Sequence, residues 1–137
     1  MIVVDASAVN AVLLGERDGA SVLEVLAEHE LLCAPALLAY EVANVLAMSR
    51  RAGRIDEREA SAALAEFTGL PWAFESHCTA IALEAIGRLC AARGLTAYDA
   101  AYVELAARRS CPIVTFDDAM RKAARAEGVQ VLPKMRG

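Results

Sequence analysis

Residues 2–5 read Ile-Val-Val-Asp, a short run of β-branched apolar residues that ends at an acid. A run of this kind, apolar on both of its faces, predicts a buried strand. Comparable runs predict further strands at 31–34, 72–74, 112–116 and 129–132. Short strands that are apolar on both faces are typical of a parallel sheet with helices on both sides.

Helical periodicity fills the segments between these strands. Ser7 and Pro35 are expected to begin the first and third helices as a cap and a first-turn proline. Caps and glycines place the helices at 8–14, from Asp18 or Ser21 through Leu26, and at 35–53, 56–67, 78–93, 96–110 and 117–128. This alternation predicts the α/β class. We expect one domain over 1–137, with three α/β/α layers around a short, mostly parallel sheet.

The composition is that of a folded domain with an acidic balance. Hydrophobic residues make up 57% and charged residues 23%, which argues against disorder, and the formal net charge is −4. Nucleic-acid binders are usually basic, so the charge asks for an explanation. We expect most basic residues to lie on solvated faces or at helix ends. Arg50, Arg51 and Arg54 are left open as residues that could contact a phosphate backbone. The basic groups are Arg50, Arg51 and Arg54; Arg108 and Arg109; Arg121, Lys122 and Arg125; and Lys134 and Arg136.

The four cysteines form no C-x-x-C pair, and the first residues do not resemble a secretion signal. We therefore predict free, mostly buried thiols and a reducing, cytoplasmic location. His29 and His77 have no zinc-ligand spacing with the cysteines, which argues against zinc.

Two acids directly follow predicted strands. Asp5 ends the first strand and Asp117 follows the run Pro-Ile-Val-Thr-Phe at 112–116. In an open parallel sheet, ligands bind outside the carboxyl ends of the strands, so we expect both acids at one edge. Asp117 is also well placed as an ordinary helix cap. A capping role is less expected for Asp5, because Ser7 already offers a cap for the helix that follows.

Two further acids lie in predicted helices. Glu41 falls on a stripe with Leu37, Val45 and Met48, where a carboxylate needs a base, a metal or an edge position reaching solvent. Asp99 lies three positions after Thr96, a spacing that on local grounds indicates a structural capping box.

As a set, Asp5, Glu41, Asp99 and Asp117 suit a hard cation such as Mg²⁺ or Mn²⁺, because carboxylates without His or Cys are its preferred ligands. Such ions clamp phosphodiester oxygens and activate water. Rival patterns are missing. The acid after the first strand is in D-A-S rather than the D-x-D of haloacid-dehalogenase-type phosphatases, a receiver's adjacent acids and late lysine are not found, and no G-x-G-x-x-G indicates a dinucleotide site.

Four motifs, in order along almost the whole chain, resemble the PIN-domain family. They are I-V-V-D-A-S-A, Y-E-V-A-N-V-L, L-T-A-Y-D-A-A-Y and I-V-T-F-D, and the third is the most specific. Length and arrangement resemble the VapC toxin subgroup.

The resemblance implies a Mg²⁺- or Mn²⁺-dependent ribonuclease, the toxin of a toxin–antitoxin pair. Asp5, Glu41, Asp99 and Asp117 would form the metal-binding catalytic pocket, with Ser7 assisting by hydrogen bonding. A VapB-like antitoxin would place a basic side chain in the pocket and would carry any binding to operator DNA, and the toxin would be a homodimer. Cations bound by the acids would offset the charge locally.

Several alternatives stay open. One is a PIN-type RNA-processing nuclease without an antitoxin, and another is a PIN-like binding module without turnover. Asp118 follows Asp117, so either could turn toward the pocket, and Asn10 and Asn44 could lie near it. The RNA target and the preferred metal are not determined by the sequence.

Overall fold

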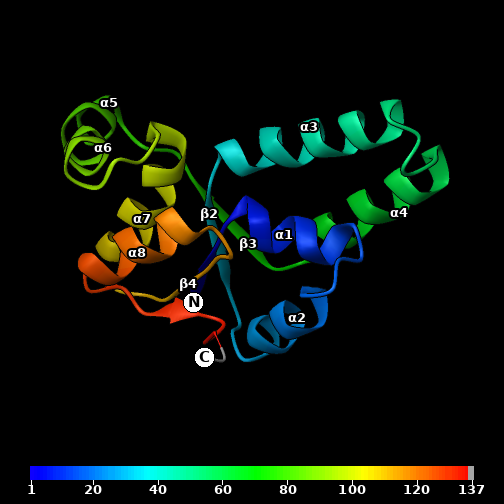
Figure 1. Cartoon of the computed structure of the whole chain (residues 1–137), viewed down its shortest axis with the longest axis horizontal. Coiled ribbons are helices and arrows are strands. Elements are labelled where there is room, and N and C mark those ends of the chain that lie inside the picture. Colours follow the sequence, from blue (N-terminus) through cyan, green and yellow to red (C-terminus); the bar gives the residue numbers. More distant parts are fainter. Residues whose placement is uncertain (136–137) are drawn as a thin grey trace.

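The Ile-Val-Val run forms the central strand of a parallel sheet. The computed structural model describes residues 1–135, and within this range a five-stranded sheet has the order β3-β2-β1-β4-β5 (Figure 1). All neighbouring pairs are parallel. The strands are β1 (Ile2–Val4), β2 (Leu32–Pro35), β3 (Trp72–Glu75), β4 (Ile113–Val114) and β5 (Val131–Leu132). The predicted parallel sheet is confirmed.

Helices cover both faces of this sheet. Figure 1 shows α1 to α4 on one side and α5 to α8 on the other, which gives the predicted α/β/α layers. The helices are α1 (Ala6–Leu13), α2 (Gly19–Ala27), α3 (Leu37–Arg51), α4 (Glu57–Thr68), α5 (Thr79–Ile81), the π-helical turn η1 (Ala82–Ile86), α6 (Gly87–Arg93), α7 (Ala97–Arg109) and α8 (Asp118–Ala126). Along the chain, the strands are added toward one edge of the sheet up to β3 and toward the other edge from β4 on. Right-handed crossovers therefore place the later helices on the opposite face.

The core fills both faces of the sheet, with α1 to α4 packed on one face and α7 on the other. Ile2, Val3 and Val4 are fully buried, and every residue of α7 from 100 to 106 is buried. Four of those residues are alanine or valine, whose small side chains let the helix lie close to β1, β2 and β4.

Local differences from the sequence predictions lie at element ends. Pro35 is the last residue of β2, paired with Glu75, and does not begin the third helix, which starts at Leu37. The helix predicted over 78–93 contains the π turn η1, which periodicity does not reveal. Only Cys33 of the four free cysteines is buried, and Cys78 is exposed, so the prediction of mostly buried thiols is wrong.

No helix in the part of the chain that the structure describes is long and apolar enough to cross a membrane. Arg136, named among the basic residues, lies outside the described residues.

Candidate active site at the carboxyl edge of the sheet

Asp5 and Asp117 lie at the same edge of the sheet, as their positions after strands predict. β1 and β4 are neighbours with Val4 opposite Val114, and the Asp5 N–H donates to the Val114 carbonyl at 3.2 Å. Asp117 lies three positions after Val114 and caps α8. The end of each strand thus passes directly into the helix that covers the sheet.

The Asp5 carboxylate is buried and accepts hydrogen bonds from three residues. One oxygen accepts from the Ala8 N–H at 2.9 Å, which makes Asp5 the cap of α1. Ser7 Oγ donates to the carboxylate, 2.7 and 2.9 Å from its two oxygens. Thr115 Oγ1 donates to the second oxygen at 2.5 Å. The prediction that Ser7 caps this helix is wrong, because Ser7 lies inside α1 and bonds to the acid that caps it.

Burial dominates the protonation of Asp5. It raises the pKa of this carboxyl from 3.8 to about 6, against the opposing effect of the hydrogen bonds from Thr115, Ala8 and Ser7. The nearby charge of Asp117 raises the pKa further. Asp5 therefore exchanges its proton close to neutral pH.

Thr115 is a site residue that sequence reasoning missed. Besides donating to Asp5, its Oγ1 accepts the Asp117 N–H at 3.1 Å, while Ser7 Oγ accepts the Phe116 N–H at 2.9 Å. The two hydroxyls therefore join the ends of β1 and β4. Thr115 is fully buried, and its signal in the sequence was the single polar residue inside an apolar run.

Glu41 projects from α3 toward the same edge. Its Oε1 accepts the Tyr102 hydroxyl of α7 at 2.6 Å. Burial raises the pKa of Glu41, the bond from Tyr102 lowers it, and the charge of Asp99 raises it. The predicted stripe was one position off: the buried residues of α3 are Leu38, Val42, Leu46 and Ser49, and Met48 is 55% exposed. Glu41 lies at the edge of that stripe. Of the three options for a carboxylate on an apolar stripe, namely a base, a metal or an edge position, the described structure shows the edge position.

Asp117 caps α8 as predicted, whereas of the capping box predicted for Thr96 and Asp99 the described residues form only the half in which Thr96 is the cap. Thr96 Oγ1 accepts the Asp99 N–H at 3.2 Å, and Asp117 Oδ1 accepts the Met120 N–H at 2.7 Å. Burial raises the pKa of Asp99, and the charge of Asp117 raises it further. Capping therefore accounts for their backbone positions, while the carboxylates also lie close enough to repel each other.

These repulsions connect all four predicted acids. Asp117 raises the pKa of Asp5 and of Asp99, and Asp99 raises that of Glu41. Within residues 1–135, none of the four forms an ion pair with lysine or arginine. Of the neighbouring pair Asp117 and Asp118, Asp117 is the one whose charge acts on Asp5 and Asp99, so it is the residue that joins the cluster. Asp118 and Asp5 both act on Arg121. No three acids, histidines or cysteines in the described range lie close enough to hold one metal ion together.

Arg121 lies buried next to this edge, where its guanidinium binds backbone carbonyls, and the prediction made for it is wrong. It was expected on a solvated face, but it is only 2% exposed. Its guanidinium donates to the carbonyls of Thr115 at 2.6 Å, Pro133 at 2.8 Å and Leu132 at 3.4 Å. Burial lowers its pKa. Arg121 thus ties the ends of β4 and β5 together beneath the Thr115–Asp5 bond.

An open groove of about 550 Å³ runs beside the acids. Glu41 and Asp99 line it from α3 and α7. The other lining residues are Leu37, Tyr40, Asn44, Thr96 and Tyr98. Asn44 therefore lies near the site, while the buried Oδ1 of Asn10 has no hydrogen-bond partner among the described residues.

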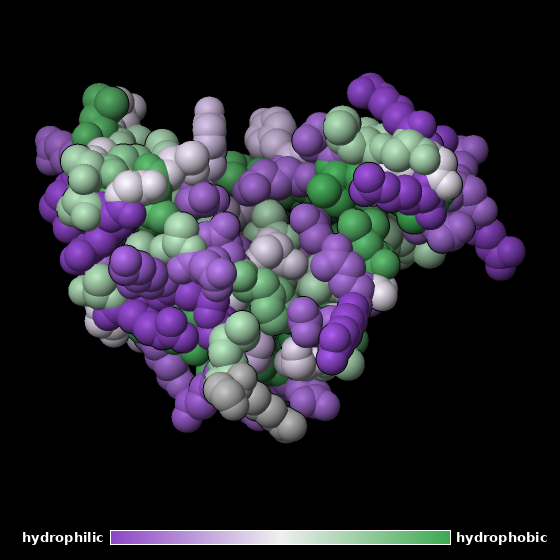
Figure 2. Space-filling model, in the orientation of Figure 1, coloured by the Kyte–Doolittle hydropathy of each residue, from purple (hydrophilic) through white to green (hydrophobic). Residues whose placement is uncertain are grey.

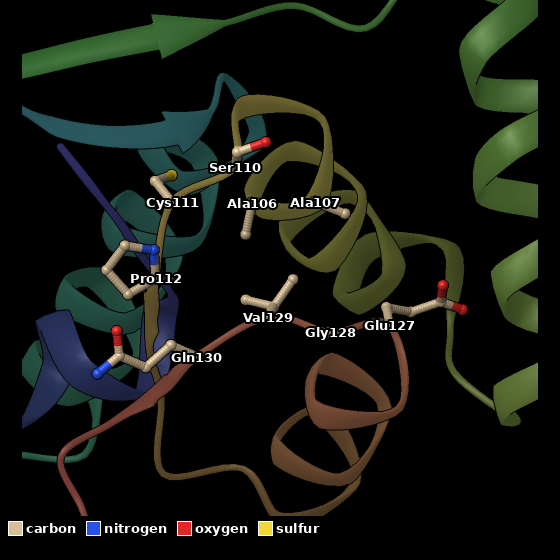
Figure 3. A pocket seen from close by; sticks show the side chains of 9 residues that line it. All are labelled: Ala106, Ala107, Ser110, Cys111, Pro112, Glu127, Gly128, Val129 and Gln130. Atoms are coloured by element: carbon tan, nitrogen blue, oxygen red, sulfur yellow. The ribbon is translucent and has the colours of Figure 1, made fainter.

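A second cavity, of about 380 Å³, lies at the opposite edge (Figure 3). Pro112 and Gln130, which line it, precede β4 and β5 and so mark the amino ends of these strands. Its one acid, Glu127, pairs with Arg88 and Arg93, and Figure 3 shows the carboxylate pointing away from the other lining side chains. This cavity has none of the unpaired acids of the carboxyl edge.

Comparison with known proteins agrees with this architecture. Residues 2–126 match the family described as PIN domain. A relative named Ribonuclease VapC3, from Pyrobaculum aerophilum, is 36% identical over 116 residues, which cover 85% of this chain and 88% of the relative. The crystal structure of PAE2754, from the same organism, superposes with a TM-score of 0.67 at 26% identity, covering 95% of this chain and 82% of the other. The chain therefore belongs to the PIN-domain family and is of its VapC type.

Proposed function

We propose that this chain is a metal-dependent endoribonuclease, and that Asp5, Glu41, Asp99 and Asp117 hold Mg²⁺ or Mn²⁺ at the carboxyl edge of the sheet. The observation that carries the proposal is a set of four carboxylates, linked by repulsion from one to the next, none of which forms an ion pair with lysine or arginine in the described part of the chain. Arg121 feels the charge of Asp5, but its donors are occupied by backbone carbonyls. Such a set is costly unless a cation balances it. PIN nucleases generally use divalent metal ions, and the relative in hand is named a ribonuclease.

The donor set fits these ions. All four side chains offer only oxygen, the donor that Mg²⁺ and Mn²⁺ prefer. Mg²⁺ usually keeps several waters and takes one or two carboxylates together with substrate phosphates. That habit suits acids that are near one another but do not gather in threes around one point. When bound, such an ion polarises a phosphodiester oxygen and lowers the pKa of a bound water.

The surrounding side chains would set the acids in place. Ser7 and Thr115 hold both oxygens of Asp5, and Tyr102 orients Glu41 by donating its hydroxyl proton. Each bond favours the charged form of its carboxylate, which is the form that binds a cation. In this proposal Ser7, Thr115 and Tyr102 are positioning residues, while the four acids bind the ion.

We also propose that the chain is the toxin of a toxin–antitoxin pair, because the relative is named VapC3. A VapB-like antitoxin would insert a basic side chain among the acids and would mediate contact with operator DNA. A homodimer and a cytoplasmic location remain predictions from the sequence. Co-expression with the product of a neighbouring short reading frame tests the pairing: a stable complex without nuclease activity supports it, and an RNA-processing nuclease would form none.

Cleavage of RNA by the purified, antitoxin-free chain tests the enzymatic proposal. Total RNA is incubated with Mg²⁺ or Mn²⁺, with and without EDTA. Asp99→Asn should abolish discrete cleavage, while Asp118→Asn, a neutralisation of the exposed neighbour of Asp117, should leave it intact. Cleavage that survives in EDTA or in folded Asp99→Asn would contradict the proposal. Folded wild-type protein that binds RNA without cutting it would favour a binding module.

Thr115→Val should shift the acid limb of the pH–activity profile upward. The substitution keeps the shape of the side chain but removes the hydrogen bond that lowers the pKa of Asp5. A hydrogen bond to a charged group contributes ~1.5–3 kcal/mol, so the limb should move by about one to two pH units. Since Asp5 binds a cation only after losing its proton, activity at neutral pH falls. Thr115→Ser keeps the hydroxyl and serves as the control. If the acid limb of the pH–activity profile has the same midpoint in both variants, the Thr115 hydroxyl does not set the pKa of Asp5.

Arg51→Ala should weaken RNA binding more than Arg50→Ala. Tyr40, Asn44 and Arg51 lie on one face of α3 at spacings of four and seven residues, whereas Arg50 projects from the side opposite Glu41. Both arginines are exposed near the end where α3 meets α4, and Figure 2 shows hydrophilic side chains projecting there. One lost phosphate contact should reduce the slope of log affinity against log salt by about 0.7 for a single strand. Equal slopes for wild type and Arg51→Ala would exclude this contact.

A further inference from the structure

All three tyrosines of the chain lie at the carboxyl edge of the sheet. Tyr102 is buried and bonded to Glu41. Tyr40 and Tyr98 line the groove, and their exposed fractions are 79% and 70%. Together with Leu83 they are the most exposed large hydrophobic residues within 1–135. Among residues 1–135, neither side chain has a hydrogen-bond partner. Neither packing nor hydrogen bonding explains why aromatic rings occupy these two positions.

Each exposed ring is the chain neighbour of one acid. Tyr40 precedes Glu41 on α3, and Tyr98 precedes Asp99 on α7. Both rings and both acids line the same groove. If the acids hold the metal ion that contacts the phosphate at which RNA is cut, the nucleotides on either side of that phosphate must enter this groove.

The groove offers flat apolar surface rather than positive charge. Its other lining residues are Leu37, Asn44 and Thr96, without lysine or arginine. Phosphates therefore have no partner along its walls, whereas the faces of nucleobases can stack on tyrosine. The polar side chains of Asn44 and Thr96 remain available to base edges.

We propose that Tyr40 and Tyr98 stack on the two nucleobases that flank the cleaved bond. The inference rests on the proposed function and assigns a base-stacking role to two residues outside the acid cluster. Bases in a duplex are already stacked on one another, and only bases splayed out of a helix can present a face to a side chain. Recognition through stacking tolerates different bases, so other contacts must choose among sequences.

Binding and cleavage of a short unpaired RNA test the inference. The probe is a fluorescent oligonucleotide that carries a cut site found with total RNA, and a matched probe has abasic nucleotides on both sides of the cut. Affinity is measured by anisotropy with Ca²⁺ in place of Mg²⁺, and kcat and KM are measured with Mg²⁺. Tyr40→Ala and Tyr98→Ala are compared with Tyr40→Phe and Tyr98→Phe, and Leu64→Ala is the control for losing an exposed apolar side chain elsewhere.

Each alanine variant should bind the intact probe roughly 5- to 100-fold more weakly, as expected for loss of one base–aromatic stack. The phenylalanine variants keep the ring and should retain affinity, and Leu64→Ala should match wild type. On the abasic probe the alanine and wild-type proteins should bind alike, a result that a merely structural role for the tyrosines would not produce.

Four outcomes separate this inference from the proposed function. Cleavage by wild type with unchanged affinity in both alanine variants overturns the inference and leaves the nuclease proposal intact. Tyrosine-dependent binding without cleavage supports stacking and overturns the nuclease proposal. Absence of both binding and cleavage overturns both. Alanine variants that change the oligomeric state or antitoxin affinity, with RNA affinity unchanged, overturn stacking and mark a protein interface.

Discussion

Asp5→Asn is expected to abolish RNA cleavage while making the metal-free protein more stable at neutral pH. Burial raises the pKa of Asp5 from 3.8 to about 6, so the charged form is disfavoured in the folded chain. That difference corresponds to ~3 kcal/mol of lost stability above pH 6. Asparagine removes the charge and is as good a helix cap as aspartate. Cleavage should fall by more than about 100-fold, since even partners of metal ligands contribute 10- to 100-fold.

The sign of this effect can be checked against pH. Below about pH 3 Asp5 is protonated whether the chain is folded or unfolded, because both pKa values lie higher, and the two proteins should be equally stable. As pH rises from 4 to 6, the unfolded chain loses the proton first, so wild type loses stability relative to Asp5→Asn. Above about pH 7 the difference is constant, because Asp5 is then ionised in both states. Urea unfolding in EDTA at about pH 3 and about pH 8 measures the difference directly.

A matched control is available at Asp56, an exposed acid that caps α4 through a 2.7 Å bond from the Glu59 N–H. Asp56→Asn changes the same kind of cap without relieving burial and should leave stability nearly unchanged at both pH values. Added Mg²⁺ or Mn²⁺ should stabilise wild type but not Asp5→Asn, because a ligand that binds only the folded state adds to its stability. Equal stability of wild type and Asp5→Asn at pH 8 in EDTA would contradict the assigned burial cost.

Arg121→Met is expected to be among the most destabilising substitutions in the chain. The guanidinium donates to three carbonyls at the ends of β4 and β5 and in the loop beyond, and it is almost fully buried. Methionine fills much of the space but leaves these carbonyls without donors. Losing hydrogen bonds to a charged group should reduce the free energy of unfolding by ~3 kcal/mol, and more if both short bonds count fully.

The same substitution should reduce cleavage in the protein that still folds, because the Thr115 carbonyl is one of the three acceptors and the Thr115 hydroxyl holds Asp5. Arg125→Met, one turn later on α8 and exposed, is the control and should change stability by less than about 0.5 kcal/mol. Thermal unfolding of both variants in EDTA measures the effect. Similar unfolding temperatures for the two variants would show that the three bonds contribute little.

The parallel sheet and the placement of Asp5 and Asp117 at one of its edges could be predicted, because both leave a local signal. Asp99 was structural on local grounds and entered the predicted site only as part of the set of four acids. An acid directly after an apolar run marks a strand end, and in a parallel sheet these ends share an edge. The partners of the acids leave no such signal. Thr115 meets Asp5 across 110 residues, and Tyr102 meets Glu41 across 61. Only the register of β1 with β4, and of α7 with α3, brings these groups together.

The predictions for Ser7 as a helix cap and for Arg121 as a solvated residue were wrong for a related reason: contacts distant in the sequence decide both. Ser7 and Asp5 are both good capping residues two positions apart, and local preference does not choose between them. Their hydrogen bonds to β4 decide the matter, since Ser7 Oγ is already engaged with the Phe116 N–H. Arg121 looked like one member of a solvated group because its neighbours Lys122 and Arg125 are indeed exposed. Its burial follows from how β5 returns beside β4.

Two of the acids also cap a helix, Asp5 for α1 and Asp117 for α8. At these two positions few replacements can inactivate the site without weakening the helix start, and asparagine is the foremost of them. If the chain is the toxin proposed above, inactive alleles that still accumulate as full-length protein in a host under selection should be enriched in asparagine at positions 5 and 117. Under the same proposal such alleles would still bind the antitoxin, so an inactive copy would reduce the amount of antitoxin left for an active one.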